Sequence, residues 1–302
     1  MAKADIHQVA VTRRPSRRRR RKRNSMEQAM TRRHRIPIIL ATLLGTLLVG
    51  AFAANAQQAP DPRIADIVRA GKLRVGYGLG APATSYQDPK TGELRGLAVD
   101  LGRALAARMG VEFQPVIYPR PGAILQGLQT NAWDVTFLAF EPARTAEVDF
   151  ATPYMQSDYA FLVLGDSAIQ RYADVDQPGI RIATPRGDSS DLHVSRLLQR
   201  AEMVRTESFA AGLDLLRTKQ VHAFTASRVN VMGYSEKIPG SRVLEEGLDV
   251  VYFAGVVPKG QPGRLAYMTD FIEQAKASGW VKQAIEREAL RGVQVAPPGN
   301  PK

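Results

Sequence analysis

Apolar residues between positions 63 and 292 follow two spacings that alternate along the chain. Short continuous apolar runs, typical of buried strands, are followed by stretches in which apolar residues recur at helical spacing. The strand-like runs are 73–75, 111–118, 133–140, 159–164, 180–184, 221–226 and 250–257. The helix-like stretches are 63–71, 97–109, 123–128, 190–200, 209–219, 265–279 and 281–290. This alternation predicts an α/β fold with mainly parallel sheets.

Glycine and proline mark where the chain is expected to turn. Residues 76–85 are rich in Gly, Pro and Ala, and residues 88–92 (DPKTG) favour a tight turn. Residues 76–81 (GYGLGA) match the glycine pattern of dinucleotide-binding folds, but Pro82 and polar turn residues follow them instead of a helix. We therefore expect no nucleotide site there. The Pro- and Gly-containing residues 293–302 are expected to form a loose tail.

The first 56 residues have the composition of an export signal. Lys and Arg dominate residues 1–35, residues 36–56 carry no charge, and Ala54-Asn55-Ala56 supplies the small residues of a cleavage site. We expect cleavage after Ala56 and a periplasmic mature protein that begins at Gln57. An uncleaved membrane anchor is the alternative, since the uncharged stretch approaches the ~20 residues that span a bilayer.

The formal net charge of +12 comes almost entirely from this leader. Of the 41 Lys and Arg and the 29 Asp and Glu, 13 and 2 lie in residues 1–35, which leaves 28 basic and 27 acidic residues after the leader. The basic run at 17–23 belongs to the leader, or to a segment that a start at Met30 would omit. The body has no basic patch with interleaved aromatic residues, so we expect no nucleic-acid partner.

The chain contains no cysteine. This excludes disulfides, thiolate metal sites and the lipidated cysteine that tethers many exported proteins. An exported protein without a tether needs an outer membrane to retain it, which again favours the periplasm. Only His193 and His222 follow the leader, so we expect neither a histidine-based metal site nor a cofactor.

Several stretches of the mature chain, taken in order, resemble the bacterial extracellular solute-binding proteins of family 3, the amino-acid-binding group. The clearest are 71–76 (GKLRVG), 91–101 (TGELRGLAVDL), 142–144 (PAR), 148–150 (VDF) and 153–154 (PY), with fainter similarity at 186–189 (RGDS), 221–226 and 279–280 (GW). No single stretch is specific. Their order and spacing over about 63–292 make the combination specific.

The resemblance implies a two-lobed fold of the type II periplasmic-binding-protein kind, with two hinge crossings. Lobe one would comprise 63–156 and 253–292, and lobe two would comprise 157–252. A small molecule would bind in the cleft between the lobes, and an ABC permease in the inner membrane would recognise the closed form. We expect the protein to be a monomer.

The resemblance places a carboxylate-binding arginine at Arg144. The chemistry agrees, because a guanidinium can hold a carboxylate through two parallel hydrogen bonds. The alternative is a salt bridge from Arg144 to Glu141 or Glu147.

A second expected contact lies between a predicted strand and a predicted helix. Gly187-Asp188-Ser189-Ser190 would offer backbone N–H groups and hydroxyls to an anionic group of the ligand. Capping of the helix by Asp188 or Ser189 is the alternative role, and the two roles are compatible.

The chain also departs from the family pattern. Gly80-Ala81-Pro82 stands where an aromatic residue usually stacks on the ligand, with Tyr86 as the expected substitute, and Pro119-Arg120-Pro121 stands near the second aromatic position. Residues 137–140 (FLAF) lack the usual hydroxyl groups. Ser227, followed by Arg228, replaces the acid that usually holds the α-ammonium group of the ligand.

These departures favour an anionic ligand over a zwitterion, because a buried ammonium group needs a counter-charge. We expect a small organic acid or an acidic amino-acid-like ligand, unless Glu141 replaces the missing acid. The expected contact residues are Arg144, Arg120, Tyr86, Glu141, Phe140, Gly187, Asp188, Ser189, Ser190, Ser227 and Arg228.

Two other functions fit the same resemblance. A few proteins of this fold are periplasmic dehydratases acting on cyclic acids, and that activity would need Glu141, Asp188 or His193 for proton transfer. A ligand-sensing adaptor would signal to a membrane receptor instead of a permease. We expect transport without catalysis, and the sequence contains no G-x-S-x-G nucleophile motif.

Overall fold

The structure is a computed structural model, and it describes residues 61–300. The predicted leader and its cleavage site lie outside these residues. The strands are β1 (Lys72–Gly78), β2 (Tyr86–Gln87), β3 (Leu94–Arg95), β4 (Glu112–Tyr118), β5 (Val135–Ala139), β6 (Val148–Leu164), β7 (Arg181–Pro185), β8 (Glu202–Thr206), β9 (Ala223–Ser227), β10 (Ser241–Val243), β11 (Val250–Pro258) and β12 (Gln294–Val295).

Seven α-helices are described in residues 61–300, together with short 3-10 turns. The helices are α1 (Ala65–Ala70), α2 (Leu97–Met109), α3 (Ser189–Leu197), α4 (Phe209–Arg217), α5 (Arg228–Ser235), α6 (Pro262–Ala277) and α7 (Trp280–Arg287). The 3-10 turns are η1 (Pro62–Ile64), η2 (Pro121–Leu128), η3 (Pro142–Arg144) and η4 (Tyr172–Asp174).

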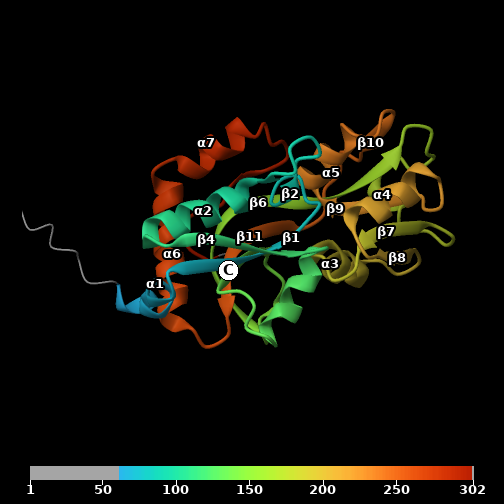
Figure 1. Cartoon of the computed structure of the whole chain (residues 1–302). Coiled ribbons are helices and arrows are strands. Elements are labelled where there is room, and N and C mark those ends of the chain that lie inside the picture. The colour runs from blue at the N-terminus through green and yellow to red at the C-terminus, as the bar shows by residue number, and fades with distance from the viewer. Residues whose placement is uncertain (1–60, 301–302) are drawn as a thin grey trace, which may run out of the picture. The chain divides into compact units, whose positions relative to one another are not determined.

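Two groups of strands are joined through β11 and β6 into one sheet (Figure 1), in the order β4-β1-β5-β11-β6-β9-β7-β8. We call β4, β1 and β5 with α1, α2, α6 and α7 the β1 half, and β9, β7 and β8 with α3, α4 and α5 the β7 half. The pairs β1·β4, β1·β5, β7·β8 and β7·β9 are parallel. Each half therefore contains the parallel sheet that the alternation of strands and helices predicts.

The strands that run between the halves pair antiparallel. Strand β6 pairs with β11 as far as Asp158 and with β9 from Tyr159 onward, and β11 also pairs with β5. The chain thus passes between the halves on two extended segments. The α/β, two-lobed fold class predicted from the sequence is confirmed. The residue limits of the two lobes stay a prediction.

Helix α2 illustrates how the sequence sets the elements of the β1 half. Its apolar residues recur at helical spacing and are buried against β1 and β4. Gly96 precedes the helix at φ 121°, and a Cβ there would lie 2.4 Å from the Thr84 carbonyl oxygen. Gly110 ends the helix in the left-handed conformation that glycine adopts without strain. The close approach at Gly96 fixes the 80–85 loop beside the start of α2.

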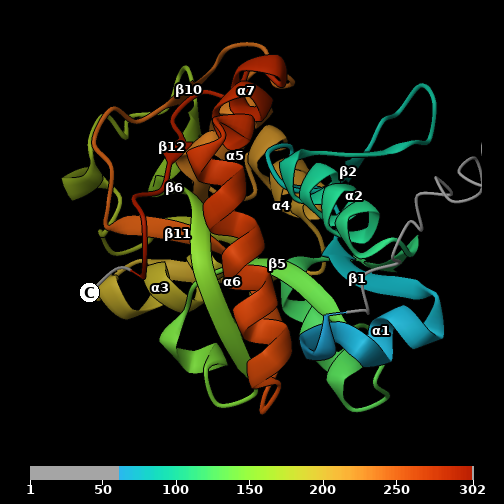
Figure 2. The same cartoon turned by 90° about the vertical axis from the view of Figure 1, so that its left-hand side faces the viewer.

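Aromatic side chains contribute to the cores of both halves. In the β7 half, Phe209, Phe224 and Tyr234 pack with ring centroids 5.7–6.5 Å apart. The β1 half packs aliphatic side chains of β1, β5 and α2 together with the rings of Tyr77 and Phe137, and α6 packs against β6 (Figure 2). Trp133 is fully buried beside η2 and donates to the Ile124 carbonyl at 2.9 Å. Both cores hold in place the strand ends that lie beside the cleft between the two halves.

Several elements were not expected from the sequence, among them the short strands β2, β3 and β10 and the three described next. Strand β8 is partly exposed and lacks an apolar run. Helix α5 begins directly after β9, in a stretch for which no helix was predicted. Strand β12 pairs with β6, and Ala296 after it is buried, with its N–H donating to the Tyr154 carbonyl. The segment expected to be a loose tail therefore begins as part of the sheet, because pairing with β6 outweighs the Pro and Gly content.

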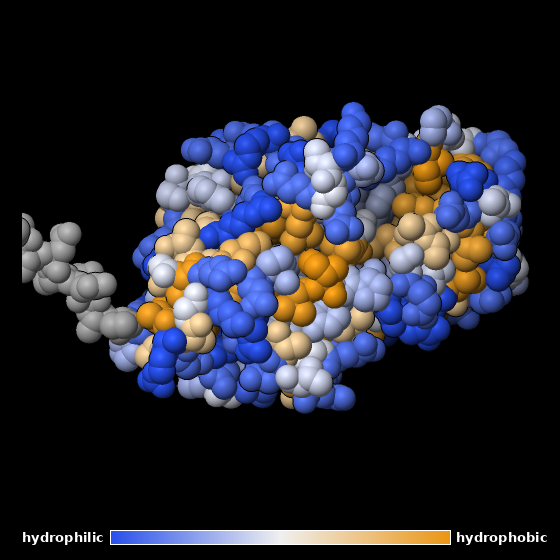
Figure 3. All heavy atoms as spheres, viewed as in Figure 1, coloured by the Kyte–Doolittle hydropathy of each residue, from blue (hydrophilic) through white to orange (hydrophobic). Residues whose placement is uncertain are grey.

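Within residues 61–300, no helix combines the length and the apolar character that crossing a membrane requires. On the face drawn in Figure 3, apolar surface is concentrated near the middle and toward one end, and polar residues cover most of the remainder. The large apolar side chains most exposed in the described part are Ile117, Phe140, Leu197 and Val250.

Candidate ligand-binding site

A small pocket lies where residues from the carboxyl ends of β5 and β9 meet the start of α3. Its lining is half polar and half apolar and comes from both halves of the molecule: Ala81, Thr84, Pro121, Phe137, Leu138, Ala139, Arg144, Asp188, Ser189, Ser227, Asn230 and Phe253. We call it the Arg144 pocket. It encloses about 20 Å³ of free space, whereas one water needs roughly 10–15 Å³. The two halves are therefore close together around it.

Arg144 is the buried cation of this pocket. It ends η3, directly after β5, and is 2% exposed. Its Nη1 donates to the Ala139 carbonyl at 2.7 Å and its Nη2 to the Gly187 carbonyl, in the β7 half, at 2.8 Å. Within residues 61–300 no carboxylate oxygen lies within 4.0 Å of its guanidinium. Arg144 thus has neutral acceptors where a buried cation would be better stabilised by an anion.

Electrostatics around Arg144 follow from its burial. Desolvation lowers the pKa of Arg144, and the more distant charges of Asp188 and Glu141 oppose that shift. Arginine keeps its proton in proteins at ordinary pH. The predicted alternative of a salt bridge to Glu141 or Glu147 is absent from the described contacts of Arg144.

The start of α3 brings three predicted residues to the pocket or beside it. Asp188 caps the helix, with Oδ1 accepting from the Ser190 N–H at 3.0 Å and from the Ser190 hydroxyl at 2.6 Å. Ser190 is fully buried and also bonds the Thr184 hydroxyl. Asp188 and Ser189 line the pocket, whereas Ser190 lies behind them.

Gly187 is one of the points where the two halves touch. Its φ of +70° suits glycine, its N–H donates to Asp191 Oδ2 at 2.8 Å, and its carbonyl accepts from Arg144. A Cβ added to Gly122, in the β1 half, would lie 2.7 Å from the Arg186 carbonyl oxygen and 2.8 Å from Gly187. Two glycines thus allow backbone-to-backbone approach next to the pocket.

Ser227 ends β9 and lines the Arg144 pocket. It is 3% exposed, and its hydroxyl has no hydrogen-bond partner among the described residues. A buried hydroxyl without a partner has an unmet requirement worth ~1–3 kcal/mol. Arg228, the next residue, turns away and forms an ion pair with Asp158 at 2.7 Å.

Glu141 is almost fully buried but does not line the pocket. It accepts from the Tyr159 hydroxyl at 2.8 Å and from Arg196 at 3.2 Å. Burial, and next the Glu141 charge, raise the pKa of Tyr159, so this hydroxyl stays a donor. His193 stacks on the Tyr159 ring at 4.7 Å and bonds Asp249 at 2.9 Å. The carboxylate of Glu141 is thus satisfied within the protein.

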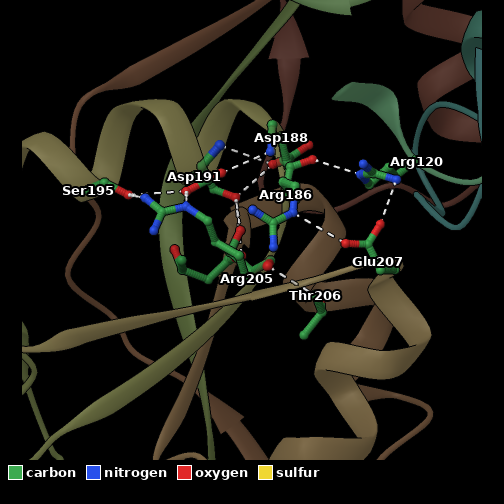
Figure 4. A network of polar contacts seen from close by, with 12 residues as sticks. Arg120, Arg186, Asp188, Asp191, Ser195, Arg205, Thr206 and Glu207 are labelled. Carbon is green, nitrogen blue, oxygen red and sulfur yellow. Dashed lines mark hydrogen bonds and ion pairs between the residues drawn. The ribbon is translucent and has the colours of Figure 1, made fainter. Parts of the chain in front are cut away.

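Arg120 lies at the rim of the cleft in a network of ion pairs (Figure 4). Its Nε donates to the Arg186 carbonyl at 3.0 Å, and its Nη1 lies 3.0 Å from Glu207. Glu207 also pairs with Arg186 at 3.2 Å. Arg120 thereby connects the β1 half to the β7 half without lining the pocket.

The other two predicted contact residues lie elsewhere. Phe140 is 38% exposed and packs edge-on against Phe150. Tyr86, in β2, lines a different cavity, where the Lys237 ammonium lies 5.9 Å from its ring centroid.

Sequence reasoning missed part of the lining. Asn230, on α5, lines the pocket, and its Oδ1 accepts from the Ala83 N–H at 3.2 Å. Thr84 and Phe253 also line it. The position of Asn230 in the first turn after Ser227 was the available signal, once a helix is recognised there. Among residues 61–300, no cluster of three or more His, Asp or Glu side chains could hold a metal ion.

Comparison with known proteins gives the family of this chain. The family model described as bacterial extracellular solute-binding proteins, family 3, matches residues 73–288. A glutamine-binding protein from Geobacillus stearothermophilus is 25% identical over 185 residues, which cover 60% of this chain and 70% of that protein.

Two solved structures are similar over most of the described part. An ancestral amino acid-binding protein, AncCDT-1, described as a precursor of cyclohexadienyl dehydratase, is 26% identical with a TM-score of 0.67 and covers 74% of this chain and 97% of its own. The amino acid ABC transporter substrate-binding protein AbpA from Streptococcus pneumoniae, bound to L-arginine, is 20% identical with a TM-score of 0.68 and covers 74% and 96%. The chain belongs to the bacterial extracellular solute-binding proteins of family 3.

Proposed function

We propose that this protein captures a small carboxylate, an organic acid or an amino acid, in the Arg144 pocket and delivers it to an ABC importer. The observation that supports this most is Arg144 itself. It is a buried guanidinium whose described partners are two carbonyl oxygens, so a ligand carboxylate would give it the anion it lacks.

The surroundings of Arg144 favour the same group. Ser189 stands in the first turn of α3, where backbone N–H groups and the helix dipole attract negative charge. The Ser227 hydroxyl can donate to a ligand oxygen, since it has no described partner. When the cleft opens, the Gly187 carbonyl would lose its contact with Arg144. When the cleft closes around a ligand, Gly187 would contact the ligand instead.

Periplasmic location and delivery to a permease complete the proposal. The family is extracellular, and the leader has the sequence of a cleavable signal. We propose cleavage after Ala56, which N-terminal sequencing of the exported protein would test. We also propose that Arg144, Ser189, Ser227 and Asp188 contact the ligand directly.

A dehydratase is the second candidate function, because one similar structure is described as a precursor of cyclohexadienyl dehydratase. Of the acid–base residues considered, only Asp188 lines the pocket, and its Oδ1 is engaged in capping α3. Glu141 and His193 bond other protein groups behind it. Incubation with cyclic acids, followed by mass spectrometry for loss of water, would reveal turnover and favour the enzyme.

Binding is tested by identifying the natural ligand. Small molecules released from the purified protein on denaturation are identified by mass spectrometry, and their affinity is measured by calorimetry. Arg144→Ala should weaken binding at least ~30-fold, because removing one partner of a buried charge pair costs ~2 kcal/mol or more. Arg69→Ala, an exposed arginine of α1, is the control. Unchanged affinity in Arg144→Ala, or stabilisation only by ligands without a carboxylate, would overturn the proposal.

A further inference from the structure

A second and larger cavity lies on the opposite side of the 80–84 loop from the Arg144 pocket. It encloses about 270 Å³ of free space, compared with about 20 Å³ around Arg144. The engineered cavity of ~150 Å³ that binds benzene shows that this volume can hold a small aromatic molecule. We call it the Tyr86 cavity. Its principal lining residues are Pro82, Tyr86, Met232, Lys237, Glu288 and Leu290.

The walls of the Tyr86 cavity come from both halves of the molecule. Pro82, Tyr86 and the segment after α7 belong to the β1 half, whereas Met232 of α5 and Lys237, which follows α5, belong to the β7 half. Neighbouring residues separate it from the Arg144 pocket. Ala81 and Asn230 line the Arg144 pocket, whereas the adjacent Pro82 and Val229 line the Tyr86 cavity. A molecule in this cavity would therefore contact both halves without entering the Arg144 pocket.

Two opposite charges in the lining, the Glu288 carboxylate and the exposed Lys237 ammonium, have no hydrogen-bonded counter-charge within residues 61–300. The Glu288 side chain is 15% exposed, and its ion-pair contacts, to Arg95 at 3.8 Å and Arg287 at 4.0 Å, both involve Oε1 and exceed hydrogen-bond distance. Within residues 61–300, no hydrogen bond is formed by this carboxylate. The Lys237 ammonium has no carboxylate within 4.0 Å in the same part of the chain and lies over the Tyr86 ring.

The apolar wall between these charges is made by a ring and flexible side chains. Tyr86 offers an aromatic face, and Met232 adapts its shape readily to a bound group. Leu290 follows Ala289, whose φ of 49° is the left-handed conformation that alanine adopts only with strain. This conformation ends α7, with the Leu290 N–H donating to the Ile285 carbonyl, and Glu288 and Leu290 on either side of it line the same cavity.

We propose that the Tyr86 cavity is a second binding site, which takes a small zwitterion with an aromatic or bulky apolar side chain. The ligand's ammonium group would pair with Glu288 and its carboxylate with Lys237, while its side chain packs against Tyr86, Met232 and Leu290. These two charges favour a dipolar ligand, since the other two charges of the lining, Glu236 and Arg291, already pair with each other at 2.6 Å. Occupation would also hold α5 against the β1 half and so stabilise the closed form.

This site does not depend on the proposed function of Arg144. Calorimetry would use L-phenylalanine as the zwitterion, phenethylamine as the analogue without a carboxylate and 3-phenylpropionate as the analogue without an amine. Each would be titrated into the wild-type protein and into Glu288→Gln, Lys237→Met, Arg144→Ala and Arg69→Ala, with circular dichroism melts to verify folding. Glu288→Gln and Lys237→Met keep side-chain size; Lys237 is exposed, and the Glu288 side chain is 15% exposed.

L-phenylalanine is expected to bind the wild-type protein at least tenfold more tightly than either analogue. Glu288→Gln and Lys237→Met should each weaken it about tenfold, a loss of ~1.4 kcal/mol, whereas Arg144→Ala and Arg69→Ala should leave it within threefold. The proposal is overturned if L-phenylalanine fails to bind up to 10 mM, about the weakest binding that calorimetry detects. It is equally overturned if binding is lost in Arg144→Ala but kept in the two cavity variants, since the ligand would then occupy the Arg144 pocket.

Discussion

The two cavities on either side of the 80–84 loop satisfy their charges in different ways. In the Arg144 pocket the cation is buried and contacts backbone carbonyls of both halves, and the free space is small. In the Tyr86 cavity the charges lie closer to solvent and the free space is larger. The Glu288 carboxylate lies 3.8 Å from Arg95, and the Lys237 ammonium lies 5.9 Å from the Tyr86 ring centroid. Burial makes the first pocket selective for one charge, because a buried cation tolerates few partners. Exposure makes the second more permissive, and its selectivity depends on two charges acting together.

The largest effect should come from removing the close backbone approach at the Arg144 pocket. A side chain at Gly122 would meet the Arg186 carbonyl and Gly187, so Gly122→Val should force the halves apart. We expect the affinity of the carboxylate ligand to fall more than tenfold, or over ~1.4 kcal/mol, in calorimetry. The affinity of the Tyr86 cavity for L-phenylalanine should fall as well, because its walls also come from both halves, and an unchanged affinity would show that this cavity does not need the closed form.

Replacement of Ser227 should separate ligand binding from stability. The Ser227 hydroxyl has no described partner, so Ser227→Ala should leave the melting temperature within ~2 °C and weaken the carboxylate ligand about fivefold, the value of one hydrogen bond. Thr225→Ala is the matched control, because the Thr225 hydroxyl donates to the Ala160 carbonyl at 3.1 Å. That variant should lose stability and little affinity. The reverse pattern would remove Ser227 from the site.

The ion pairs at the cleft rim should matter less than the buried pocket. Glu207 is 70% exposed and pairs with Arg120 and Arg186 (Figure 4). Glu207→Ala should weaken ligand binding no more than about fivefold, because exposed ion pairs contribute ~1 kcal/mol at most. The effect should disappear at high salt. An effect that persists in 1 M NaCl, where the Debye length is ~3 Å, would show that this network is not simply electrostatic.

The smallest effect concerns the strained wall of the Tyr86 cavity. Glycine adopts the φ of 49° found at Ala289 without strain. Ala289→Gly should therefore change the free energy of unfolding by only ~0.5–1 kcal/mol, with relief of strain opposing the greater freedom of the unfolded chain. Denaturant titration measures the change. A loss of more than 2 kcal/mol would mean that the alanine methyl group contributes packing that its exposure does not suggest.

The sequence predicted the fold better than it predicted the contacts within it. Alternating spacings identified most strands and helices, because periodicity reports which face of an element is buried. They missed α5, which begins at Arg228 directly after β9. They therefore also missed Asn230 of α5, which lines the Arg144 pocket. The elements that lack a long apolar pattern were the ones that only tertiary packing defines.

Among the predicted contact residues, Arg144, Asp188, Ser189 and Ser227 lie together, and Tyr86, Glu141, Arg120, Phe140 and Arg228 do not join them. The first group stands at strand ends and helix starts, positions that the order of elements already directs toward the cleft. Arg228 pairs with Asp158, and Glu141 bonds Tyr159 and Arg196. Those partners are distant in sequence, and no local pattern indicates which long-range partner a charged side chain will take.

The central claim, that Arg144 holds a ligand carboxylate, is tested most directly by a cycle of two changes. The tightest-binding carboxylate and its uncharged carboxamide would be titrated into the wild-type protein and into Arg144→Ala. The wild-type protein should prefer the carboxylate by roughly 30-fold or more, and the preference should fall below threefold in Arg144→Ala, because the charge pair is then absent from both complexes. The same preference in both proteins would contradict the claim, since another residue would then recognise the carboxylate.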